Sequence, residues 1–415
     1  MTSIQEIHEP PYIADMTKLT SFAEIDEVLR SKDFAQGSHR ESHAFLGESI
    51  LLLDGDEHFD RRRLESGLFT KQALAYYEHH ALVPVIDQAM KECDDQRGDD
   101  GVVRADLVPL SRTMLLRIAA AVTGIDGVDT PESTERFRWI VEEFGSAVTV
   151  EWSTEDHDAV IAAGLEVRTA FEREFWDPSV ARRRELIAEH RAGRLDATEL
   201  PRDLITTLYL NWEDDWDDEL PLREGTLYLV AATQTTTHAV PHIVRHLLEW
   251  LEEHPEDEHL RTDPDFLRKA SQESMRLHLP APSLLRFATA DVTLSSGRVI
   301  KEGERVACLF TPANRDVERF GEDSATFNPY REVTGRTKPW GLTFGGGEHL
   351  CIGRPLVTGL SSRNPDEPGT IGTVLNILLT LVDSGVQLDP EQSPQYMATS
   401  HHDAYETFPV LLVNR

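Results

Sequence analysis

The chain contains few cysteines for its length. Only three occur in 415 residues, Cys93, Cys308 and Cys351, and they lie far apart in the sequence. No CxxC pair is present, and no set of cysteines suggests a disulfide framework. This usage is typical of proteins that fold in a reducing compartment, so we expect a cytoplasmic protein.

Basic residues are scarce relative to acidic ones. Lysine and arginine together number 41, against 73 aspartates and glutamates, and the formal net charge is −32. A field of this sign repels phosphate backbones and anionic lipid headgroups. The composition therefore argues against nucleic acid and against a membrane surface as partners.

Long apolar runs are absent as well. No stretch of about 18 apolar residues occurs, and the first residues, MTSIQEIHEPPYIADMTKL, lack the basic-then-apolar pattern of a signal peptide. We expect no membrane-spanning segment. With 40% hydrophobic residues the chain can bury a sizeable core. Since no linker or internal repeat is visible, we expect one domain over residues 1–415.

One glycine-rich stretch stands out, Thr343–Gly353, with the sequence TFGGGEHLCIG. Glycine adopts backbone conformations closed to other residues, so such a loop can approach a flat ligand closely. Its Cys351 could act as a nucleophile, bind a metal or fill space in a turn. The spacing F-G-x-G-x-H-x-C-x-G resembles the haem-binding loop of the cytochrome P450 family. The resemblance implies that the Cys351 thiolate ligates haem iron.

The same resemblance assigns other residues of this loop to the cofactor, which is expected to be haem b. It implies that Phe344 packs near the thiolate and keeps water away. It further implies that His349 neutralises a haem propionate and that Gly353 belongs to the cofactor-binding loop. Backbone N–H groups of the loop could hydrogen-bond the sulfur and moderate its electron donation.

A second motif lies in the segment Asp54–Arg63, DGDEHFDRRR. His58 and Arg62 are four residues apart and would share one helix face. Alone, the segment could be a solvated basic turn. It resembles the family's C helix, in which a His and an Arg at this spacing hydrogen-bond a haem propionate. Arg61 and Arg63 are expected to point elsewhere, to the plain surface or to a face that receives an electron-transfer partner.

Apolar spacing predicts a long central helix from about Leu222 to Glu253. Its threonine-rich middle could be a buried helix whose hydroxyls bond back to the preceding turn. It also resembles the family's A/G-G-x-D/E-T-T motif, which places Ala231 and Ala232 at the substrate pocket and Thr235 as the catalytic alcohol. Gln234 stands where the family has an acid. An amide cannot exchange a proton as a carboxylate does, so Gln234 can only orient water or hold a hydrogen bond.

Three residues are expected to be structural. Glu273 and Arg276 are three apart on a predicted helix and can pair. Such pairs are common on protein surfaces and contribute little there. The family, however, buries an E-x-x-R pair and joins it to a downstream arginine, for which Arg331 is the candidate here.

The segment between these residues contains Pro280 and Pro282, which exclude a regular helix. The resemblance implies that Ala281 and Leu284 line the substrate side of the haem and that Arg286 binds a propionate. An arginine at the start of a strand is otherwise commonly just exposed. Two short strands, Asp291–Leu294 and Val299–Ile300, are predicted to follow, joined by a Ser-Ser-Gly turn.

The helix behind the cysteine departs from the family pattern. Pro355 comes early, and the composition of Leu360–Thr370 predicts a loop where the family has one unbroken helix. The helix is expected to resume over Thr373–Asp383. This interruption bears on the shape of the face that meets the electron donor.

The resemblance covers nearly the whole chain and implies a definite fold. We expect a mainly α protein with a small β region, a triangular single domain whose long central helix crosses the haem. It looks like the soluble, bacterial type. The implied activity is that of a monooxygenase, which inserts one oxygen atom from O2 into a small apolar organic substrate by hydroxylation or oxidative dealkylation. Electrons would come from a ferredoxin and its reductase.

Two alternatives follow from the residues themselves. Because Gln234 replaces the acid, hydrogen peroxide could serve in place of O2 and electrons, which would make the protein a peroxygenase. A haem-thiolate protein could also be a non-catalytic sensor. The pocket-lining segments and Thr235 favour catalysis over the sensor.

Overall fold

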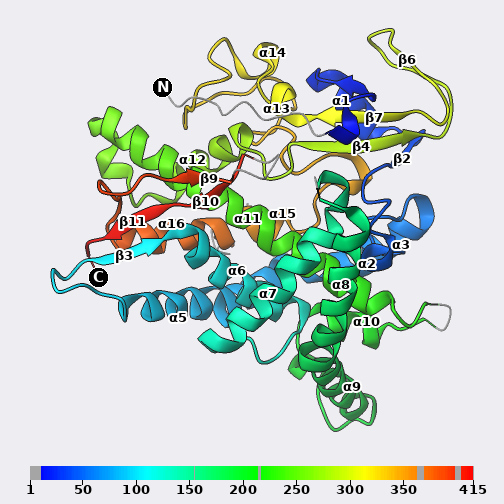
Figure 1. Cartoon of the computed structure of the whole chain (residues 1–415), viewed down its shortest axis with the longest axis horizontal. Helices are drawn as coiled ribbons and strands as arrows, with labels where there is room; N and C mark the ends of the chain where they lie inside the picture. Colours follow the sequence, from blue (N-terminus) through cyan, green and yellow to red (C-terminus); the bar gives the residue numbers. More distant parts are fainter. Residues whose placement is uncertain (1–10, 154, 214–215, 362–368, 398–402, 415) are drawn as a thin grey trace. The chain divides into compact units, whose positions relative to one another are not determined.

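The computed structural model describes residues 11–153, 155–213, 216–361, 369–397 and 403–414 (Figure 1). The chain forms two compact units. One unit comprises residues 1–38, 86–112 and 235–415, and the other comprises residues 39–85 and 113–234. The long helix α11 (Leu220–Glu253) contributes its first part to the second unit and the rest to the first.

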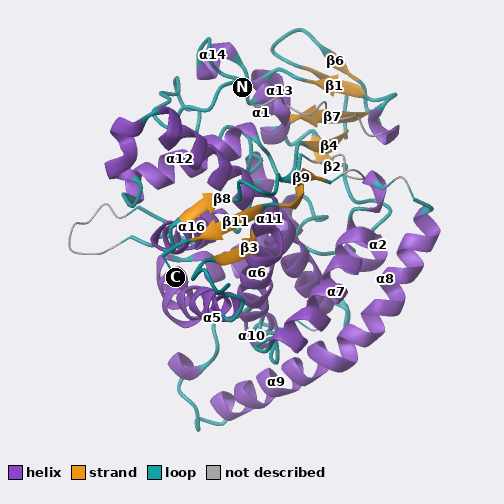
Figure 2. Cartoon of the chain, turned by 60° about the vertical axis from the view of Figure 1, so that its left-hand side comes forward, coloured by secondary structure: helices purple, strands orange, loops and turns teal. Residues whose placement is uncertain are grey.

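The unit of residues 39–85 and 113–234 is helical in its described part. Helices α7 and α8 lie side by side in it (Figure 2). The start of α7 is fixed by Thr130, which accepts a hydrogen bond from the Ser133 amide while the Ser133 hydroxyl caps Thr130 in return. The helices wholly within this unit are α2 (His43–Leu46), α3 (Gly55–Glu65), α4 (Lys71–Tyr77), α7 (Pro131–Val148), α8 (His157–Phe171), α9 (Asp177–Arg191) and α10 (Leu204–Leu210).

The other unit combines helices with all the strands. Its own helices are α1 (Phe22–Arg30), α12 (Pro264–Leu277), α13 (Phe310–Ala313), α14 (Val317–Phe320), α15 (Arg354–Thr358) and α16 (Thr373–Asp383). Like α11, the helices α5 (Val83–Asp94) and α6 (Leu107–Thr123) begin in one unit and end in the other. Short 3₁₀ and π turns, labelled η, include η8 (Gly347–His349).

Four small sheets belong to this unit. The largest has the order β1-β7-β4-β2, with β1 (Thr17–Leu19) parallel to β7 (Arg305–Leu309) and both β4 (Ser283–Ala288) and β2 (Phe34–Gln36) antiparallel to their neighbours. A second sheet pairs β3 (Val103–Asp106) and β8 (Val386–Leu388) with β11 (Pro409–Leu412), which lies between them (Figure 2). Two hairpins complete the set: β5 (Val292–Thr293) with β6 (Val299–Ile300), and β9 (Gln395–Tyr396) with β10 (Tyr405–Thr407).

Apolar side chains hold the large sheet against helix α1. Ile25 and Leu29 of α1 are buried with Val306 of β7 in one cluster, which also includes the buried Phe310 and Phe320. Burial of this kind stabilises the fold by roughly 1.5–3 kcal/mol for each large side chain. These contacts fix the end of α1, which the glycine-rich stretch around Cys351 contacts.

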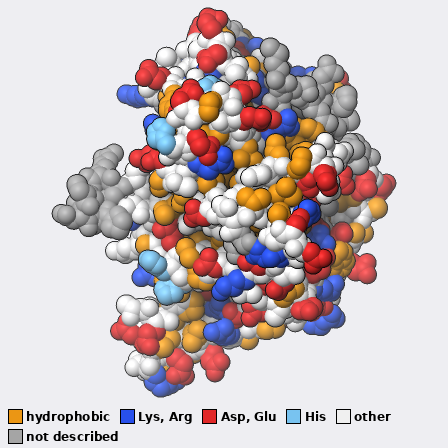
Figure 3. Space-filling model, turned by 90° about the vertical axis from the view of Figure 1, so that its left-hand side faces the viewer, with side chains coloured by type: hydrophobic (Ala, Val, Ile, Leu, Met, Phe, Trp, Pro, Cys, Tyr) orange, Lys and Arg blue, Asp and Glu red, His pale blue; other side chains and the backbone are white. Residues whose placement is uncertain are grey.

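The surface reflects the composition. Figure 3 shows acidic side chains spread over the visible face, as expected for a net charge of −32. Among the described helices, none combines the length and the apolar character that crossing a bilayer requires.

Several predicted elements are confirmed. The central helix runs over Leu220–Glu253, α16 over Thr373–Asp383, and the predicted strand pair forms as β5 and β6. The helix after the cysteine is interrupted, since α15 ends at Thr358 and a bridge joins Leu360 to Thr370. Residues 362–368 of the predicted loop lie outside the described residues. A single domain over residues 1–415 stays a prediction.

Candidate functional site

The glycine-rich stretch Thr343–Gly353, here called the cysteine loop, contains η8 and ends where α15 begins, and Cys351 lies between η8 and α15. The Cys351 amide donates to the Phe344 carbonyl at 2.9 Å and closes the loop. Gly347 has φ +65°, and a Cβ there would lie 1.7 Å from the main-chain oxygen of Leu29 on α1. Only glycine allows this approach. The loop is therefore held by its backbone and leaves the Cys351 side chain exposed.

Of the three cysteines, Cys351 is the exposed one, while Cys93 and Cys308 are buried. Burial raises the pKa of Cys308 to about 12, which keeps it a thiol at neutral pH. An accessible cysteine on a glycine loop suits a thiolate ligand of a planar cofactor. The donor set thus fits haem at Cys351 and not at the other two positions.

Trp340, which precedes the loop, packs against residues on both sides of Cys351 in the sequence. The ring of Phe344 meets that of Trp340 edge-on at a centroid distance of 5.8 Å. The Arg354 guanidinium lies over the same Trp340 ring at 5.3 Å. His349 and Gly353 are half-buried in the loop. This arrangement agrees with the apolar, water-excluding position expected for Phe344.

Strand β4 lies beside the cysteine loop. A Cβ at Gly345 would lie 3.9 Å from Leu284 Cδ1. Leu284 and Arg286 are two apart in the strand, so their side chains leave it on the same face. Arg286 is buried, and its Nη1 donates to Gln36 Oε1 and to the Leu285 carbonyl, both at 2.9 Å. The structure thus places Leu284 near the cysteine loop, with buried Arg286 two residues further along the strand and half-buried Ala281 just before it.

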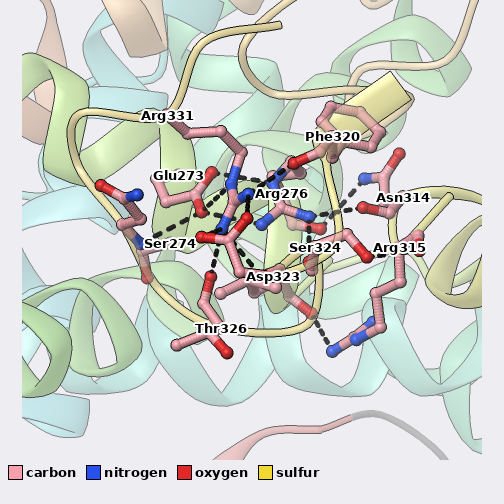
Figure 4. A network of polar contacts seen from close by, with 12 residues as sticks. Glu273, Ser274, Arg276, Asn314, Arg315, Phe320, Asp323, Ser324, Thr326 and Arg331 are labelled. Carbon is pink, nitrogen blue, oxygen red and sulfur yellow. Dashed lines mark hydrogen bonds and ion pairs between the residues drawn. The ribbon is translucent and has the colours of Figure 1, made fainter. Parts of the chain in front are cut away.

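The three residues predicted to be structural form one buried network (Figure 4). Arg276 donates to both Glu273 carboxylate oxygens at 2.7 Å. Arg331 Nε donates to Glu273 Oε1, also at 2.7 Å. Arg276 Nη1 donates to the main-chain oxygens of Asn314 and Ser324. The Nη atoms of Arg331 donate to main-chain oxygens and to the Asp323 carboxylate.

Asn314 connects this network to the cysteine loop. Its Nδ2 donates to the Arg276 carbonyl at 3.0 Å, and its Oδ1 accepts from the Leu342 amide at 2.8 Å. The Thr343 hydroxyl donates to the Met275 carbonyl at 2.8 Å. Leu342 immediately precedes the loop and Thr343 is its first residue. These hydrogen bonds therefore fix where the loop begins.

In the unit of residues 39–85 and 113–234, helix α3 carries His58 and Arg62. The helix forms as predicted, so the two side chains, four residues apart, lie on one face. His58 is buried and Arg62 half-buried. Arg61 corrects a prediction, because it is not a surface residue. Its side chain is only 9% exposed and pairs with Glu224 of α11 at 2.8 Å.

Two buried glutamates meet near Arg61, a feature that sequence reasoning missed. Glu224 Oε1 accepts from Arg61 and from the Ile50 amide, each at 2.8 Å, and the Tyr228 hydroxyl donates to Glu65 Oε2 at 2.8 Å. Glu65 Oε1 and Glu224 Oε2 accept no hydrogen bond from other described residues. Burial raises the pKa of both carboxyls, that of Glu65 well above its usual range. A proton shared between the two carboxyls would satisfy both oxygens. The signal in the sequence was a glutamate inside an apolar helix.

Replacing Glu65 with glutamine should remove the pH dependence that this proton imposes. A carboxyl whose pKa is raised by folding stabilises the fold at low pH and loses that contribution as pH rises through the folded pKa. Above the ordinary value of 4.5 the wild type should lose up to about 1.4 kcal/mol of stability per pH unit relative to Glu65→Gln. Urea unfolding at pH 5 and pH 8 measures this difference.

The matched control is Glu57→Gln, which removes an exposed carboxylate from the same helix. Its stability should follow the wild-type pH curve. Parallel curves for Glu65→Gln and the wild type would contradict a shared proton.

In the middle of α11, exposed and buried side chains lie on different faces of the helix. Ala231 and Thr235, four apart, are exposed, and Ala232 is half-buried. The Thr233 hydroxyl is buried and donates back to the Leu229 carbonyl at 2.7 Å, as expected for a threonine-rich helix. The accessible face of α11 therefore carries small side chains and the Thr235 hydroxyl.

Gln234 lies against helix α7. A Cβ at Gly145 would lie 1.7 Å from Gln234 Nε2, so the amide occupies the space that a side chain would fill there. The residue that replaces the family's acid is thus accommodated by a glycine on a neighbouring helix. This pairing was not visible in the sequence, where the two positions are 89 residues apart.

Comparison with known proteins agrees with the geometry. The family model for cytochrome P450 matches residues 15–358. C-19 steroid 1alpha-hydroxylase of Sorangium cellulosum is 26% identical over 358 residues, 85% of this chain and 78% of the relative. 6-deoxyerythronolide B hydroxylase of Saccharopolyspora erythraea is 29% identical over 312 residues, 73% of this chain and 65% of the relative. Matches to two further relatives span only 31% and 39% of those proteins.

Solved structures show the same fold. Substrate-free CYP109E1 from Bacillus megaterium superposes with a TM-score of 0.69 at 20% identity, over 95% of this chain and 92% of that one. P450BioI in complex with a fatty-acyl carrier protein gives a TM-score of 0.68 over the same shares at 20% identity. The expected fold class, mainly α with small sheets, is confirmed. On the family match and the fold together, the chain belongs to the cytochrome P450 family.

Proposed function

We propose that the protein is a haem b monooxygenase that inserts one oxygen atom from O2 into a small apolar organic substrate. The observation that carries this proposal is the exposed Cys351 on a glycine loop, together with the exposed Thr235 on α11. Curated relatives are named as hydroxylases and as a steroid C26-monooxygenase. Their names support the enzyme class expected from the sequence.

Cys351 would hold the haem iron as a thiolate. When bound, a haem-thiolate supplies oxygen activation, because the thiolate donates electrons that favour O–O cleavage. His58, Arg62, Arg286 and His349 would neutralise the propionates through charge-assisted hydrogen bonds. Phe344, held edge-on by Trp340, would keep water from the sulfur.

Four residues would form part of the substrate pocket: Ala231, Ala232, Ala281 and Leu284. The side chains are small or apolar. Ala231 is exposed, and the other three residues are partly buried. Such a lining suits a compact hydrocarbon-rich substrate whose C–H bonds are oxidised. Hydroxylation and oxidative dealkylation are both compatible with it.

Thr235 would hold a proton-donating water at the accessible face of α11. Gln234 cannot supply that proton, because an amide does not ionise in the working pH range. Its packing on Gly145 leaves it a positioning role. Electrons would come from a ferredoxin and its reductase in a reducing cytoplasm.

The amide at Gln234 also favours a second candidate, a peroxygenase. Hydrogen peroxide carries oxygen that is already reduced, so it needs no acid on α11. Turnover with peroxide alone is therefore compared with turnover with O2, NADPH and a ferredoxin–reductase pair. We expect the electron-driven route to be faster, whereas rapid peroxide turnover with none from electrons would reverse the ranking.

Gln234→Glu should raise electron-driven turnover, by up to about 100-fold, which is the lower end of what a positioned acid contributes. The replacement is isosteric, so Gly145 still leaves room for it. The rate of product formation with O2, NADPH and the ferredoxin–reductase pair measures the effect. Gln72→Glu, an exposed change on α4, should leave this rate unchanged. An unaltered rate in Gln234→Glu would count against a proton-supply role for this position.

Binding spectra separate an enzyme from a haem sensor. Small apolar compounds that enter a substrate pocket displace water from the iron and shift the Soret band. A panel of such compounds that leaves the spectrum unchanged would favour the sensor.

A further inference from the structure

A second cluster of ligand-type side chains lies in the unit that contains the sheets. His242 comes from α11, His278 follows α12, and Asp403 precedes β10. All three side chains are about nine-tenths buried or more, with 3%, 10% and 8% exposed. A ring nitrogen of each histidine and a carboxylate oxygen lie within 4.8 Å of one another. None of the three residues has a role in the proposed reaction.

Asp403 is the centre of this cluster. Its Oδ2 is hydrogen-bonded to His278 Nδ1. Its main-chain oxygen lies 2.8 Å from His242 Nε2, and its Oδ1 lies 3.9 Å from the same nitrogen. Oδ1 is buried and accepts no hydrogen bond from the residues that the structure describes. A buried carboxylate oxygen without a donor is costly, and a bound cation would satisfy it.

The surroundings of the cluster are aromatic. The His242 and His278 rings are stacked at a centroid distance of 4.0 Å, and the Tyr405 ring lies 4.7 Å from that of His242. Both imidazoles are at least nine-tenths buried, so little water reaches them. His246, which packs at 5.0 Å from His278, is engaged with the Ser274 hydroxyl.

Two arginines face the cluster, and each has other partners. Arg245 pairs with Glu249 at 2.7 Å and donates to the Tyr405 hydroxyl at 2.8 Å. Arg315 donates to the main-chain oxygens of Thr311 and Leu277, both at 2.9 Å. Among the described residues, neither guanidinium is hydrogen-bonded to the Asp403 carboxylate, so the carboxylate can take a cation.

We propose that His242, His278 and Asp403 bind a divalent transition-metal cation of the Zn²⁺ class. Two imidazole nitrogens and one carboxylate oxygen are a donor set that Zn²⁺ prefers. Ligand atoms about 2.0–2.2 Å from one ion can be at most ~4 Å apart, and the 3.9 Å between His242 Nε2 and Asp403 Oδ1 meets that limit. Binding of the ion at Asp403 Oδ1 releases the proton between His278 and Asp403 to solvent, and His242 carries its proton on Nδ1. A water or the Asp403 carbonyl completes the shell.

Such a site would join segments far apart in the sequence. It links the second half of α11 to the segment behind Arg276 and to the β9–β10 hairpin. An ion that binds the folded chain and not the unfolded one stabilises the fold and raises the melting temperature. The site is therefore structural and distinct from the cysteine loop.

Equilibrium dialysis of the haem-loaded protein against micromolar Zn²⁺, followed by metal analysis, tests this proposal. Zinc is counted separately from haem iron, so the result does not depend on activity. We expect one tightly bound Zn²⁺ per chain, a higher melting temperature with Zn²⁺, and no such rise with Mg²⁺, which prefers oxygen ligands. Asp403→Asn and His278→Gln should each weaken binding at least about tenfold.

His259→Gln, an exposed change on the surface, is the matched control and should bind as the wild type does. Circular dichroism and the Soret band verify that each variant is folded. If one variant does not fold, the other variant and the wild-type titration still decide. Absence of tight zinc in the wild type, or equal binding in Asp403→Asn and His278→Gln, would overturn the site.

Discussion

Replacing Cys351 with serine should abolish the red-shifted Soret band that the reduced wild-type protein shows with carbon monoxide. That band requires a thiolate ligand to the haem iron, which Cys351 would provide and serine cannot. Substrate turnover should fall by more than about 100-fold, because even loss of a hydrogen-bond partner of a metal ligand costs 10–100-fold. The reduced, carbon monoxide-bound spectrum and turnover of the haem-loaded variant measure both effects.

Cys93→Ala is the matched control, because it removes a buried cysteine far from the loop in sequence. It should keep the red-shifted band. The structure also predicts that Cys351→Ser remains folded, since the loop is held by the Cys351 amide and by glycine contacts with α1, and neither needs the sulfur. A red-shifted band that persists in Cys351→Ser would refute the assignment of the ligand.

Local spacing allowed much of the fold and the candidate site to be predicted. His58 and Arg62 fall on one face of α3 because four residues make about one helical turn. The bounds of α16 follow from turn-forming residues before it and apolar periodicity within it. The family resemblance added Arg331 to the Glu273 network, which spacing alone could not do.

Contacts between distant residues were not predictable. Arg61 was expected at the surface because its neighbours are charged, yet it pairs with Glu224, 163 residues away. The two buried carboxyls of Glu65 and Glu224 likewise come from segments far apart in the sequence. His242, His278 and Asp403 each look ordinary in the sequence, and only the tertiary fold brings them within reach of one ion.

The Glu273 network explains why the cysteine loop has a fixed start. Arg276 and Arg331 both donate to the Glu273 carboxylate. Asn314 is hydrogen-bonded to the Leu342 amide and so connects this network to the start of the loop. Glu273, Arg276 and Arg331 are not expected to contact the haem or the substrate. Its loss should therefore reduce stability first and cofactor retention second.

Glu273→Ala should destabilise the protein by about 3–5 kcal/mol, because it leaves the buried Arg276 guanidinium without a carboxylate and leaves Arg331 with Asp323 alone. Glu273→Gln keeps one hydrogen-bond acceptor and should cost less. Denaturant unfolding of the haem-loaded protein measures the free energies. If Glu273→Ala does not accumulate as folded protein, the comparison rests on Glu273→Gln.

The surface pair Glu258–Arg261 provides the matched control for this prediction. It has the same i,i+3 spacing and a 2.6 Å contact, but Glu258 is 54% exposed. Water screens both charges there, so Glu258→Ala should cost no more than about 1 kcal/mol. The difference between the two glutamates then measures burial and not the pairing pattern. Equal losses in Glu258→Ala and Glu273→Ala would mean that the buried network contributes no more than an exposed ion pair, and the cysteine loop would need another support.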